Sequence, residues 1–248
     1  MEYLDLAILF VVGSLAGIIN VFAGGGSTLT LPTLIFLGLD SALANGTNRI
    51  AIIIQNVFAI FGFQQERVNQ FKMSLGYALF TLPGAIIGAL AAIRINDLWF
   101  QRILAVIMVL VVISMFMPRP GREGNRESSQ KPSWMLYLAL FGIGFYGGFI
   151  QVGVGFLLMA ALYHLARYTL LIVNVHKVFI VLIYTIPALL VFILSGNVDF
   201  SYGLALGLGT GIGGWFAARL SVKKGEKAIR VVLSLAIIIM SLKLLNIF

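Results

Sequence analysis

Two short polar motifs lie inside long apolar segments of this chain and carry the residues best suited to chemistry. They are Asn45-Gly46-Thr47-Asn48-Arg49 and Asn174-Val175-His176-Lys177. A cation near the bilayer interior costs at least ~2.5–3.5 kcal/mol on insertion scales, so a buried Arg49 or Lys177 should be paired, hydrated or matched by an anionic ligand. Apart from Asp5 at the edge of the first, no acidic residue lies in a hydrophobic segment to pair with them. The motifs therefore indicate a binding site for an anion.

Each motif follows a glycine cluster that interrupts an apolar run. Three consecutive glycines, Gly24-Gly25-Gly26, disfavour a continuous helix, and amides without intrahelical partners are tolerated at membrane depth only beside protein or a water-filled cavity. We expect Ser27 and Thr28 to cap the helix that follows, whose N-terminus would direct N–H donors and a positive dipole end at an anion. The cluster before the second motif contains Gln151, Gly153 and Gly155.

Simpler interpretations of these residues stay open. The glycines could serve only to let helices pack closely. Arg49 and Lys177 lie within about two turns of their helix ends and could extend to the lipid headgroups. His176 is a candidate carrier of a coupling proton because histidine titrates near neutrality, but a structural histidine is an equally good interpretation. A half-buried cation near a glycine break in each region is nevertheless what an inward-facing anion site requires.

The composition decides which class of protein holds these motifs. The chain has 248 residues, of which 60% are hydrophobic and 10% are charged, and its mean hydropathy is +1.02. Soluble domains are about 25% charged, so this chain has too few charged residues to cover its apolar surface in water. It is predicted to be an integral membrane protein. Because basic loops orient membrane helices, the net charge of +8 does not indicate a nucleic-acid partner.

The apolar runs predict an all-α polytopic membrane protein. A helix needs about 20 apolar residues to cross roughly 30 Å of hydrocarbon, about twice the length of an outer-membrane strand. Two stretches, 29–38 and 155–166, follow the glycine clusters and are too short to cross alone, so we expect half-helices of re-entrant hairpins there. Eight longer runs are expected to cross, namely 4–22, 42–63, 73–93, 98–117, 134–152, 170–194, 201–219 and 228–246.

The two halves of the chain resemble each other, at a spacing of 129 positions over about 50 residues and at an offset that differs by one to three positions further on. We therefore expect two homologous repeats, 1–117 and 134–248, joined by a hydrophilic cytoplasmic linker over 118–133. The residue pairs at this spacing are Gly13 and Gly142, Gly24 and Gly153, Gly26 and Gly155, Leu29 and Leu158, Asn45 and Asn174, Ala59 and Ala188, and Phe63 and Phe192.

Loop charge predicts the orientation of the chain. If each hairpin enters and leaves on one side, most basic residues fall on one face, which the positive-inside rule makes cytoplasmic. Both termini then lie outside, and the repeats have opposite topology, as in many secondary transporters. The compact length and short loops fit a prokaryotic inner membrane. The basic residues of this face are Arg67, Lys72, Arg119, Arg122, Arg126, Lys131, Arg167, Arg219, Lys223, Lys224, Lys227 and Arg230.

Several kinds of chemistry have no residues to support them. The chain contains no Cys, no phosphate-loop glycine–lysine motif, no carboxylate ladder, no zinc-binding His pair and no nucleophile beside an evident base. We therefore expect no enzyme activity, no catalytic residue, no cofactor and no metal site. The expected partners are a small anionic substrate and the lipid bilayer, and homo-oligomerisation is left open.

With these motifs the sequence resembles the TauE/SafE family, also called the sulfite exporter or toluenesulfonate-uptake family of permeases. The likeness spans nearly the whole chain and departs from the family where Val175 and His176 replace a small residue and Thr. It implies a transporter of sulfite, sulfoacetate or other organosulfonates, coupled to protons in many members. The matching motifs are Ala23-Gly24-Gly25-Gly26-Ser27, Ala44-Asn45-Gly46-Thr47-Asn48, Gln151-Val152-Gly153-Val154-Gly155 and Asn174-Val175-His176-Lys177.

The residues and the resemblance together predict one central site between the repeats. A sulfonate is a compact oxyanion that accepts hydrogen bonds from helix N-termini, Asn amides and Lys or Arg. Alternating access would move one half against the other around the site. The alternatives are a passive anion channel and a membrane scaffold. The predicted substrate-binding residues are Gly24, Gly25, Gly26, Ser27, Thr28, Asn45, Thr47, Asn48 and Arg49 on one wall, with Gln151, Gly153, Gly155, Asn174, His176 and Lys177 opposite.

Overall fold

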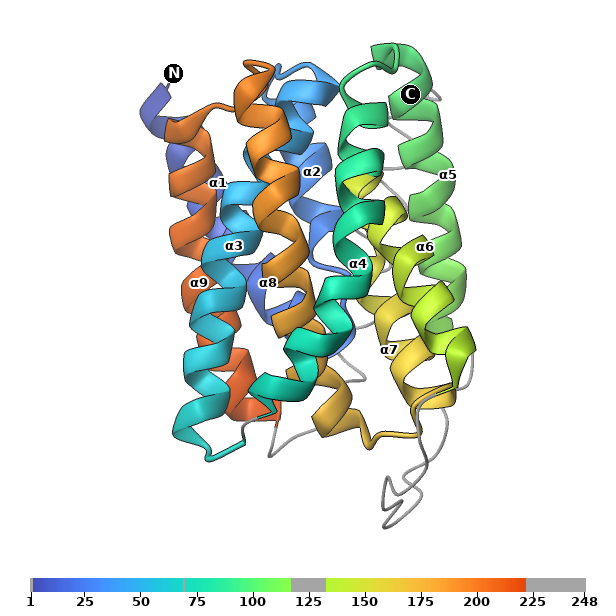
Figure 1. Ribbon diagram of the computed structural model, residues 1–248. Coiled ribbons are helices and arrows are strands. Elements are labelled where there is room, and N and C mark those ends of the chain that lie inside the picture. Colours follow the sequence, from blue (N-terminus) through green and yellow to red (C-terminus); the bar gives the residue numbers. More distant parts are fainter. Residues whose placement is uncertain (1, 69, 117–132, 222–248) are drawn as a thin grey trace.

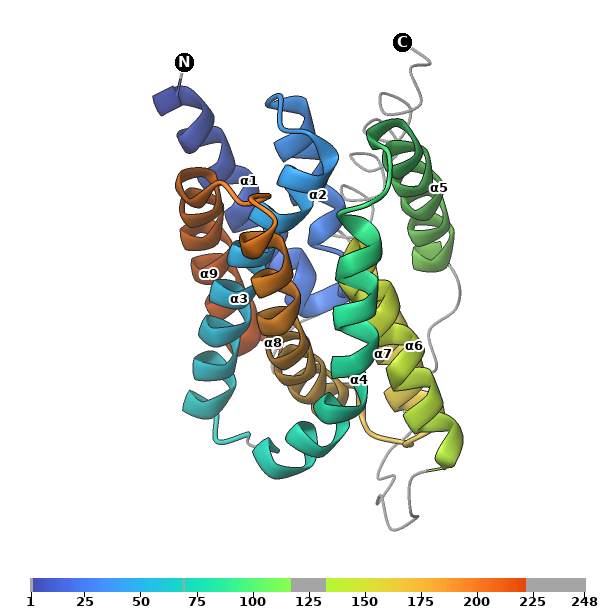
Figure 2. The same ribbon diagram turned by 45° about the horizontal axis from the view of Figure 1, so that its top comes forward.

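The computed structural model describes residues 2–68, 70–116 and 133–221, and the regular elements in these ranges are all helices (Figure 1). They stand side by side in a bundle, which confirms the all-α prediction for the described residues (Figures 1 and 2). The elements are α1 (Glu2–Ala23), α2 (Ser27–Phe36), α3 (Ser41–Gln65), α4 (Phe71–Ala92), α5 (Asp97–Phe116), α6 (Trp134–Ile150), α7 (Val154–His164), α8 (Leu170–Leu194) and α9 (Phe200–Ser221).

The lengths and surfaces of the helices suit a membrane. Among the described residues, α1, α3, α4 and α8 are long and apolar enough to cross one. Large apolar side chains such as Leu79 and Leu190 are more than half exposed, as lipid contact requires. The runs expected at 98–117, 134–152 and 201–219 correspond to α5, α6 and α9. The run at 228–246 and all but the last residue of the linker at 118–133 lie outside the described residues, so the number of crossings stays a prediction.

Both predicted glycine breaks interrupt a helix. α1 ends at Ala23 and α2 begins at Ser27, while α6 ends at Ile150 and α7 begins at Val154. Gly24 and Gly153 have φ angles of +80° and +76°, a region that side chains with a Cβ rarely adopt. The helices after the breaks have 10 and 11 residues, and at 1.5 Å per residue they are too short to cross roughly 30 Å of hydrocarbon.

The two halves have matching helices. α3 and α8 each have 25 residues, α4 and α9 each have 22, and both pairs begin 129 positions apart. α3 and α8 run in opposite directions, because Gly46 near the start of α3 lies against Phe192 near the end of α8 (Figure 1). The order and spacing are those that the predicted repeat requires. Homology between the halves stays a prediction.

Glycines on four helices let the two halves pack with their backbones in contact. α1 packs most extensively on α9, and α4 on α6. A Cβ on Gly17 would overlap the carbonyl oxygen of Thr210, and one on Gly88 would overlap that of Phe145, so these contacts need glycine. The glycines at these two interfaces, spaced four apart, are Gly13 and Gly17, Gly209 and Gly213, Gly84 and Gly88, and Gly144 and Gly148.

Acidic side chains tie several helix starts together at one end of the bundle. Asp5 accepts a hydrogen bond from the Tyr202 hydroxyl at 3.1 Å, and Asp97 accepts one from the Ser41 amide at 2.7 Å. At the opposite end, Arg219 and Glu66 form an ion pair at 3.4 Å. The N-termini of α1, α3, α5 and α9 therefore share one end, which is the upper end in Figure 1. Which end faces the cytoplasm stays a prediction.

Candidate anion-binding site

The two glycine breaks cross each other inside the bundle. Gly24 and Gly155 are both buried, and a Cβ on either would overlap the backbone of the other. The C-terminal ends of α1 and α6 and the N-terminal ends of α2 and α7 are therefore brought together, although they come from opposite halves of the chain. The two glycines allow the backbones of the two breaks to pack in direct contact. Because helix ends carry polar backbone groups without intrahelical partners, many such groups lie close together at this crossing.

A small polar cavity of about 10 Å³ lies beside this crossing. Small-molecule sites typically have volumes of roughly 300–1,000 Å³, whereas this cavity has room for about one water molecule, so binding of a ligand requires the cavity to widen. Its walls come from both breaks and from the long helices α3 and α8. The lining residues are Asn20, Gly24, Ser27, Asn56, Gln151, Val154, Gly155, Lys177 and Val181.

Lys177 connects α8 to the end of α1 at this cavity. Its side chain is 2% exposed, and Nζ donates to the carbonyl oxygens of Asn20 at 3.0 Å and Val21 at 3.1 Å. Nζ also donates to Asn174 Oδ1 at 2.9 Å, one turn earlier on α8. Asn20 and Val21 lie in the last turn of α1, at the negative end of the helix dipole, and the Asn20 carbonyl oxygen also accepts from the Gly24 amide at 2.8 Å.

Arg49 makes the corresponding connection from α3 to the end of α6. Its side chain is fully buried, and its guanidinium donates to the carbonyl oxygens of Gly147, at 3.2 Å, and Gly148. Asn45 supports it by accepting from Nη2 at 3.4 Å and by donating to the carbonyl oxygen of Phe149 at 2.8 Å. The Phe192 ring lies 4.7 Å from the guanidinium carbon and closes the other side.

The burial of Arg49 and Lys177 argues against the interpretation in which they extend to the headgroups. Each is instead compensated by the carbonyl end of a broken helix from the opposite half. Hydrogen bonds to a charged donor are worth roughly 1.5–3 kcal/mol each, enough to offset much of the cost of burying the cation. The cations therefore cross-link the halves as well as making the interior positive.

The expected helix cap at Ser27 and Thr28 is wrong. The cap position of α2 is Gly26, which has no side chain to accept from the first amides, and the Thr28 hydroxyl donates to the carbonyl oxygen of Gly25. Asn20 takes the capping role from the preceding helix, because its Oδ1 accepts from the Gly26 amide at 3.3 Å. The chain changes direction at the glycine break, and this brings the Asn20 side chain of α1 within hydrogen-bond distance of the Gly26 amide at the start of α2.

The structure brings together part of the predicted residue set. All of the predicted residues are buried, but only some line the cavity, and Asn174 reaches it through Lys177. Thr47 is directed elsewhere, because its hydroxyl accepts from the Asp199 amide at 2.9 Å. The lining members are Gly24, Ser27, Gln151, Gly155 and Lys177, whereas Gly25, Gly26, Thr28, Asn45, Thr47, Asn48, Arg49, Gly153, Asn174 and His176 are outside the lining.

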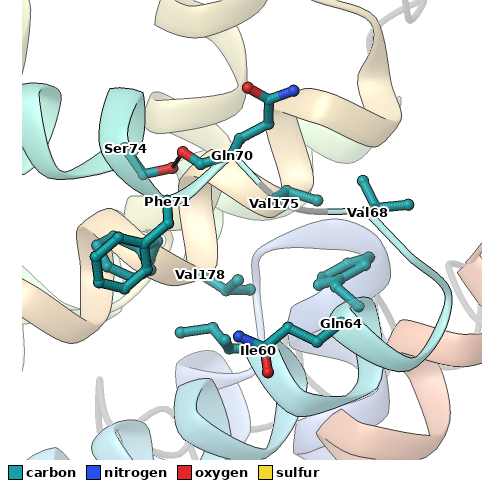
Figure 3. A pocket seen from close by; sticks show the side chains of 10 residues that line it. Ile60, Gln64, Val68, Gln70, Phe71, Ser74, Val175 and Val178 are labelled. Carbon is teal, nitrogen blue, oxygen red and sulfur yellow. Dashed lines mark hydrogen bonds between the residues drawn. The ribbon is translucent and has the colours of Figure 1, made fainter.

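His176 belongs to a separate cluster on the other side of α8. Its Nδ1 lies 2.8 Å from Ser74 Oγ, and its ring contacts the rings of Tyr77 and Tyr168. Ser74 also lines a second cavity, of about 20 Å³, between the end of α3, the start of α4 and α8 (Figure 3). In Figure 3 the Ser74 hydroxyl donates to the Gln70 carbonyl, at 2.9 Å. His176 is therefore hydrogen-bonded to a residue that lines the second cavity.

Sequence reasoning missed two amide residues of the main cavity. Asn20 is the sole polar residue among its immediate neighbours in an apolar run, just before the glycine cluster, and that isolation was an available signal. Asn56, on α3, also lines the cavity, and its side chain donates to the Ile52 carbonyl oxygen at 2.7 Å. Gln151 donates to the Tyr184 hydroxyl at 2.8 Å, while its Oε1 is buried without a partner among the described residues.

Asn48 is the predicted residue with the least satisfied side chain. It is fully buried, and neither its Oδ1 nor its Nδ2 has a hydrogen-bond partner in the described part of the chain. At the repeat spacing of 129, Asn48 corresponds to Lys177, whereas Arg49 corresponds to Val178. The two cations therefore stand at non-equivalent positions of their helices.

Comparison with known proteins gives a consistent result over nearly the whole chain. Residues 9–244 match the family described as sulfite exporter TauE/SafE. The probable membrane transporter protein ORF9 of a Sinorhizobium species is 29% identical over 97% of this chain and 92% of its own length. The probable membrane transporter protein YfcA of Escherichia coli K12 is 30% identical over 97% of this chain and 89% of its own length.

A more distant relative extends the same pattern to another bacterial lineage. The probable membrane transporter protein YunE of Bacillus subtilis is 24% identical over 98% of this chain and 98% of its own length. No solved structure gave a significant match. The relatives identify a type of protein but name no substrate.

Proposed function

The chain belongs to the TauE/SafE sulfite exporter family of membrane transporters, and on that premise we propose that it is a secondary transporter of a small sulfur oxyanion or organosulfonate. It would work by alternating access in a prokaryotic inner membrane, coupled to protons. Family membership also makes it a transporter rather than an enzyme. The substrate, the coupling ion and the mechanism are the parts that we propose.

The observation that carries the proposal is the polar cavity at the crossing of the two breaks. Lys177 supplies a buried positive charge there, and Asn20, Asn56 and Gln151 supply amides that can donate to oxygen atoms. The first turns of α2 and α7 add backbone amides and positive dipole ends. A pyramidal or tetrahedral oxyanion needs several donors converging from different directions, and this lining offers them from both halves of the chain.

Alternating access is supported by how the halves meet. The matching lengths of α3 and α8 and of α4 and α9, with opposite directions in the bundle, favour an inverted repeat. The cavity lies at the interface that such halves would move across. Arg49 and Lys177 bind carbonyl groups of the opposite half, so they are well placed to resist motion until substrate competes for the ammonium of Lys177.

Proton coupling is proposed to involve His176. Its ring joins the second cavity through Ser74, and its chain neighbour Lys177 lines the first cavity. This arrangement supports a route by which protonation near one end of the bundle could influence the substrate site. We further propose that both termini lie outside, with the end that holds Arg67, Arg167 and Arg219 in the cytoplasm.

The test is uptake of labelled methanesulfonate and sulfite into proteoliposomes. We expect saturable uptake by the intact protein and a loss of at least about a hundredfold in Lys177→Met, because the anion would then lack a buried counter-charge. Lys72→Met is the matched control, since Lys72 is exposed at the start of α4. Wild-type uptake by Lys177→Met would remove Lys177 from the mechanism, and large unitary currents in bilayer recordings would indicate a channel instead.

A further inference from the structure

The two cavities lie one after the other along the groove between α3 and α8. On α3, Asn56 lines the main cavity and Ile60, one turn later, lines the second. On α8, which runs in the opposite direction, Val181 lines the main cavity and Val178, about one turn earlier, lines the second. Both helices therefore place the second cavity nearer the end of the bundle at which α3 ends.

The second cavity borders the surface of the protein at that end. Among its lining residues, Gln64 is exposed and Val68 and Gln70 are half-buried. Val175 and Val178, on its inner side, are almost completely buried. Figure 3 shows how these side chains surround the cavity. The second cavity therefore leads from the surface toward the interior of the bundle.

A buried cluster of apolar side chains, the apolar plug, separates the two cavities. Its members Phe63 and Val178 are each 1% exposed, and both also line the second cavity. Each of the helices α1, α3 and α8 lines the main cavity within one turn of a plug residue, through Asn20, Asn56 and Lys177 respectively. The plug residues on these helices are Val21 and Phe22, Ala59 and Phe63, and Val175 and Val178.

The barrier on this side of the main cavity is thin. Seven residues of α3 separate Asn56 from Phe63, which is about 10 Å at 1.5 Å per residue. In the other direction, fifteen residues, about 22 Å, separate Asn56 from the start of the helix at Ser41. That longer stretch is held to α6 by hydrogen bonds from Asn45 and Arg49. The main cavity is therefore closed by a thin apolar layer on one side and by a thick, hydrogen-bonded layer on the other.

We propose that substrate passes between the main cavity and the end of the bundle at which α3 ends through the groove between α3 and α8, and that Phe63 and Val178 form the gate of this route. The proposal rests on the proposed transport function and identifies the access route of its site. An apolar constriction excludes water and ions until it widens. Because α3 and α8 belong to different halves of the chain, a movement of one half against the other would separate the two side chains and open the route.

Chemical labelling can test the route because the chain contains no cysteine. Val181→Cys places one thiol in the wall of the main cavity. The reagent is a membrane-impermeant methanethiosulfonate that carries a sulfonate group, added to membrane vesicles of each orientation that contain the full-length protein. Gln65→Cys and Ser195→Cys mark the two ends of the bundle, since both positions are exposed and follow helices that run in opposite directions. We expect slow labelling of Val181→Cys from the side that labels Gln65→Cys.

Smaller side chains in the plug should speed this labelling. Adding Phe63→Ala should raise the labelling rate of Val181→Cys at least about tenfold from that side and leave it unchanged from the other, because the constriction would admit water. Phe61→Ala is the matched control, since Phe61 lies on the same helix but is 56% exposed. Val178→Ala removes less volume from the same plug, and it serves as the second variant where Phe63→Ala does not fold.

Two outcomes would overturn the route. One is labelling of Val181→Cys from the side that labels Ser195→Cys. The other is a labelling rate that neither Phe63→Ala nor Val178→Ala changes in folded protein. Labelling requires no transported substrate, so these outcomes would leave the proposed function standing. Absence of methanesulfonate and sulfite uptake by the protein without substitutions would instead overturn the proposed function.

Discussion

Arg49 and Lys177 make corresponding contacts in two regions of the molecule. Each projects from a 25-residue helix of one half and donates to the last-turn carbonyls of the broken helix of the other half. The regions differ in what surrounds the cation. Arg49 is enclosed by backbone, Asn45 and the Phe192 ring, whereas Lys177 lies beside a cavity lined by amides. The Arg49 region therefore links the two halves, whereas the Lys177 region links them and also borders the cavity that we propose as the ligand site.

The difference between these regions follows from a shift of one residue. At the repeat spacing, the partner of Lys177 is Asn48, and the partner of Arg49 is Val178. In the proposed repeat, both halves make a cation–carbonyl contact, whereas only the second half places its cation beside the cavity. Variants that affect the Arg49 region, the Lys177 region or the neighbouring His176 cluster separately should therefore have different effects on stability, binding and uptake.

The largest effect is expected from Arg49→Met. It leaves the last carbonyls of α6 without their donors in a dry interior, and we expect a loss of about 2 kcal/mol or more of stability. Thermal unfolding followed by size-exclusion chromatography in detergent measures it. Arg102→Met is the control, because Arg102 is exposed and its guanidinium lies over the Trp99 ring. Unchanged stability with lost methanesulfonate binding would instead make Arg49 a ligand residue.

A smaller effect, confined to binding, is expected at Asn20. Asn20→Asp places a negative charge in the cavity wall near Lys177, so methanesulfonate affinity should fall by about tenfold or more. Asn20→Ala removes the amide and the acceptor of the Gly26 amide, worth about 1 kcal/mol, and should cost less. If titration calorimetry gave equal affinities for both variants, the Asn20 side chain would not face the ligand.

The smallest effect is expected from Ser74→Ala. It removes the hydrogen bond to His176 at the second cavity and leaves the lining of the main cavity intact. We expect unchanged methanesulfonate affinity and severalfold slower uptake when a proton gradient drives it. Proteoliposome assays with and without the gradient separate the two quantities. Full gradient-driven uptake would exclude the Ser74–His176 pair from proton coupling.

Much of the architecture was predictable because it depends on local chemistry. Both breaks formed at the predicted glycine clusters, and the helix boundaries fell close to the ends of the apolar runs. The residues of the cavity were only partly predictable. Gln151, Lys177 and Ser27 were predicted, but Asn20 was missed and Arg49 was assigned to the wrong surroundings, because a side chain's direction depends on how helices from distant segments cross.

The sequence by itself determined that this is a helical membrane protein of the TauE/SafE family, with two breaks and two buried cations that need compensation. Those conclusions rest on hydrophobic length, glycine conformation and the cost of charge in lipid, which act residue by residue. Only the tertiary structure decided what compensates the cations and which of them lines the cavity. Carbonyl groups at helix ends become partners only when the two halves fold against each other, and no spacing along the chain records that contact.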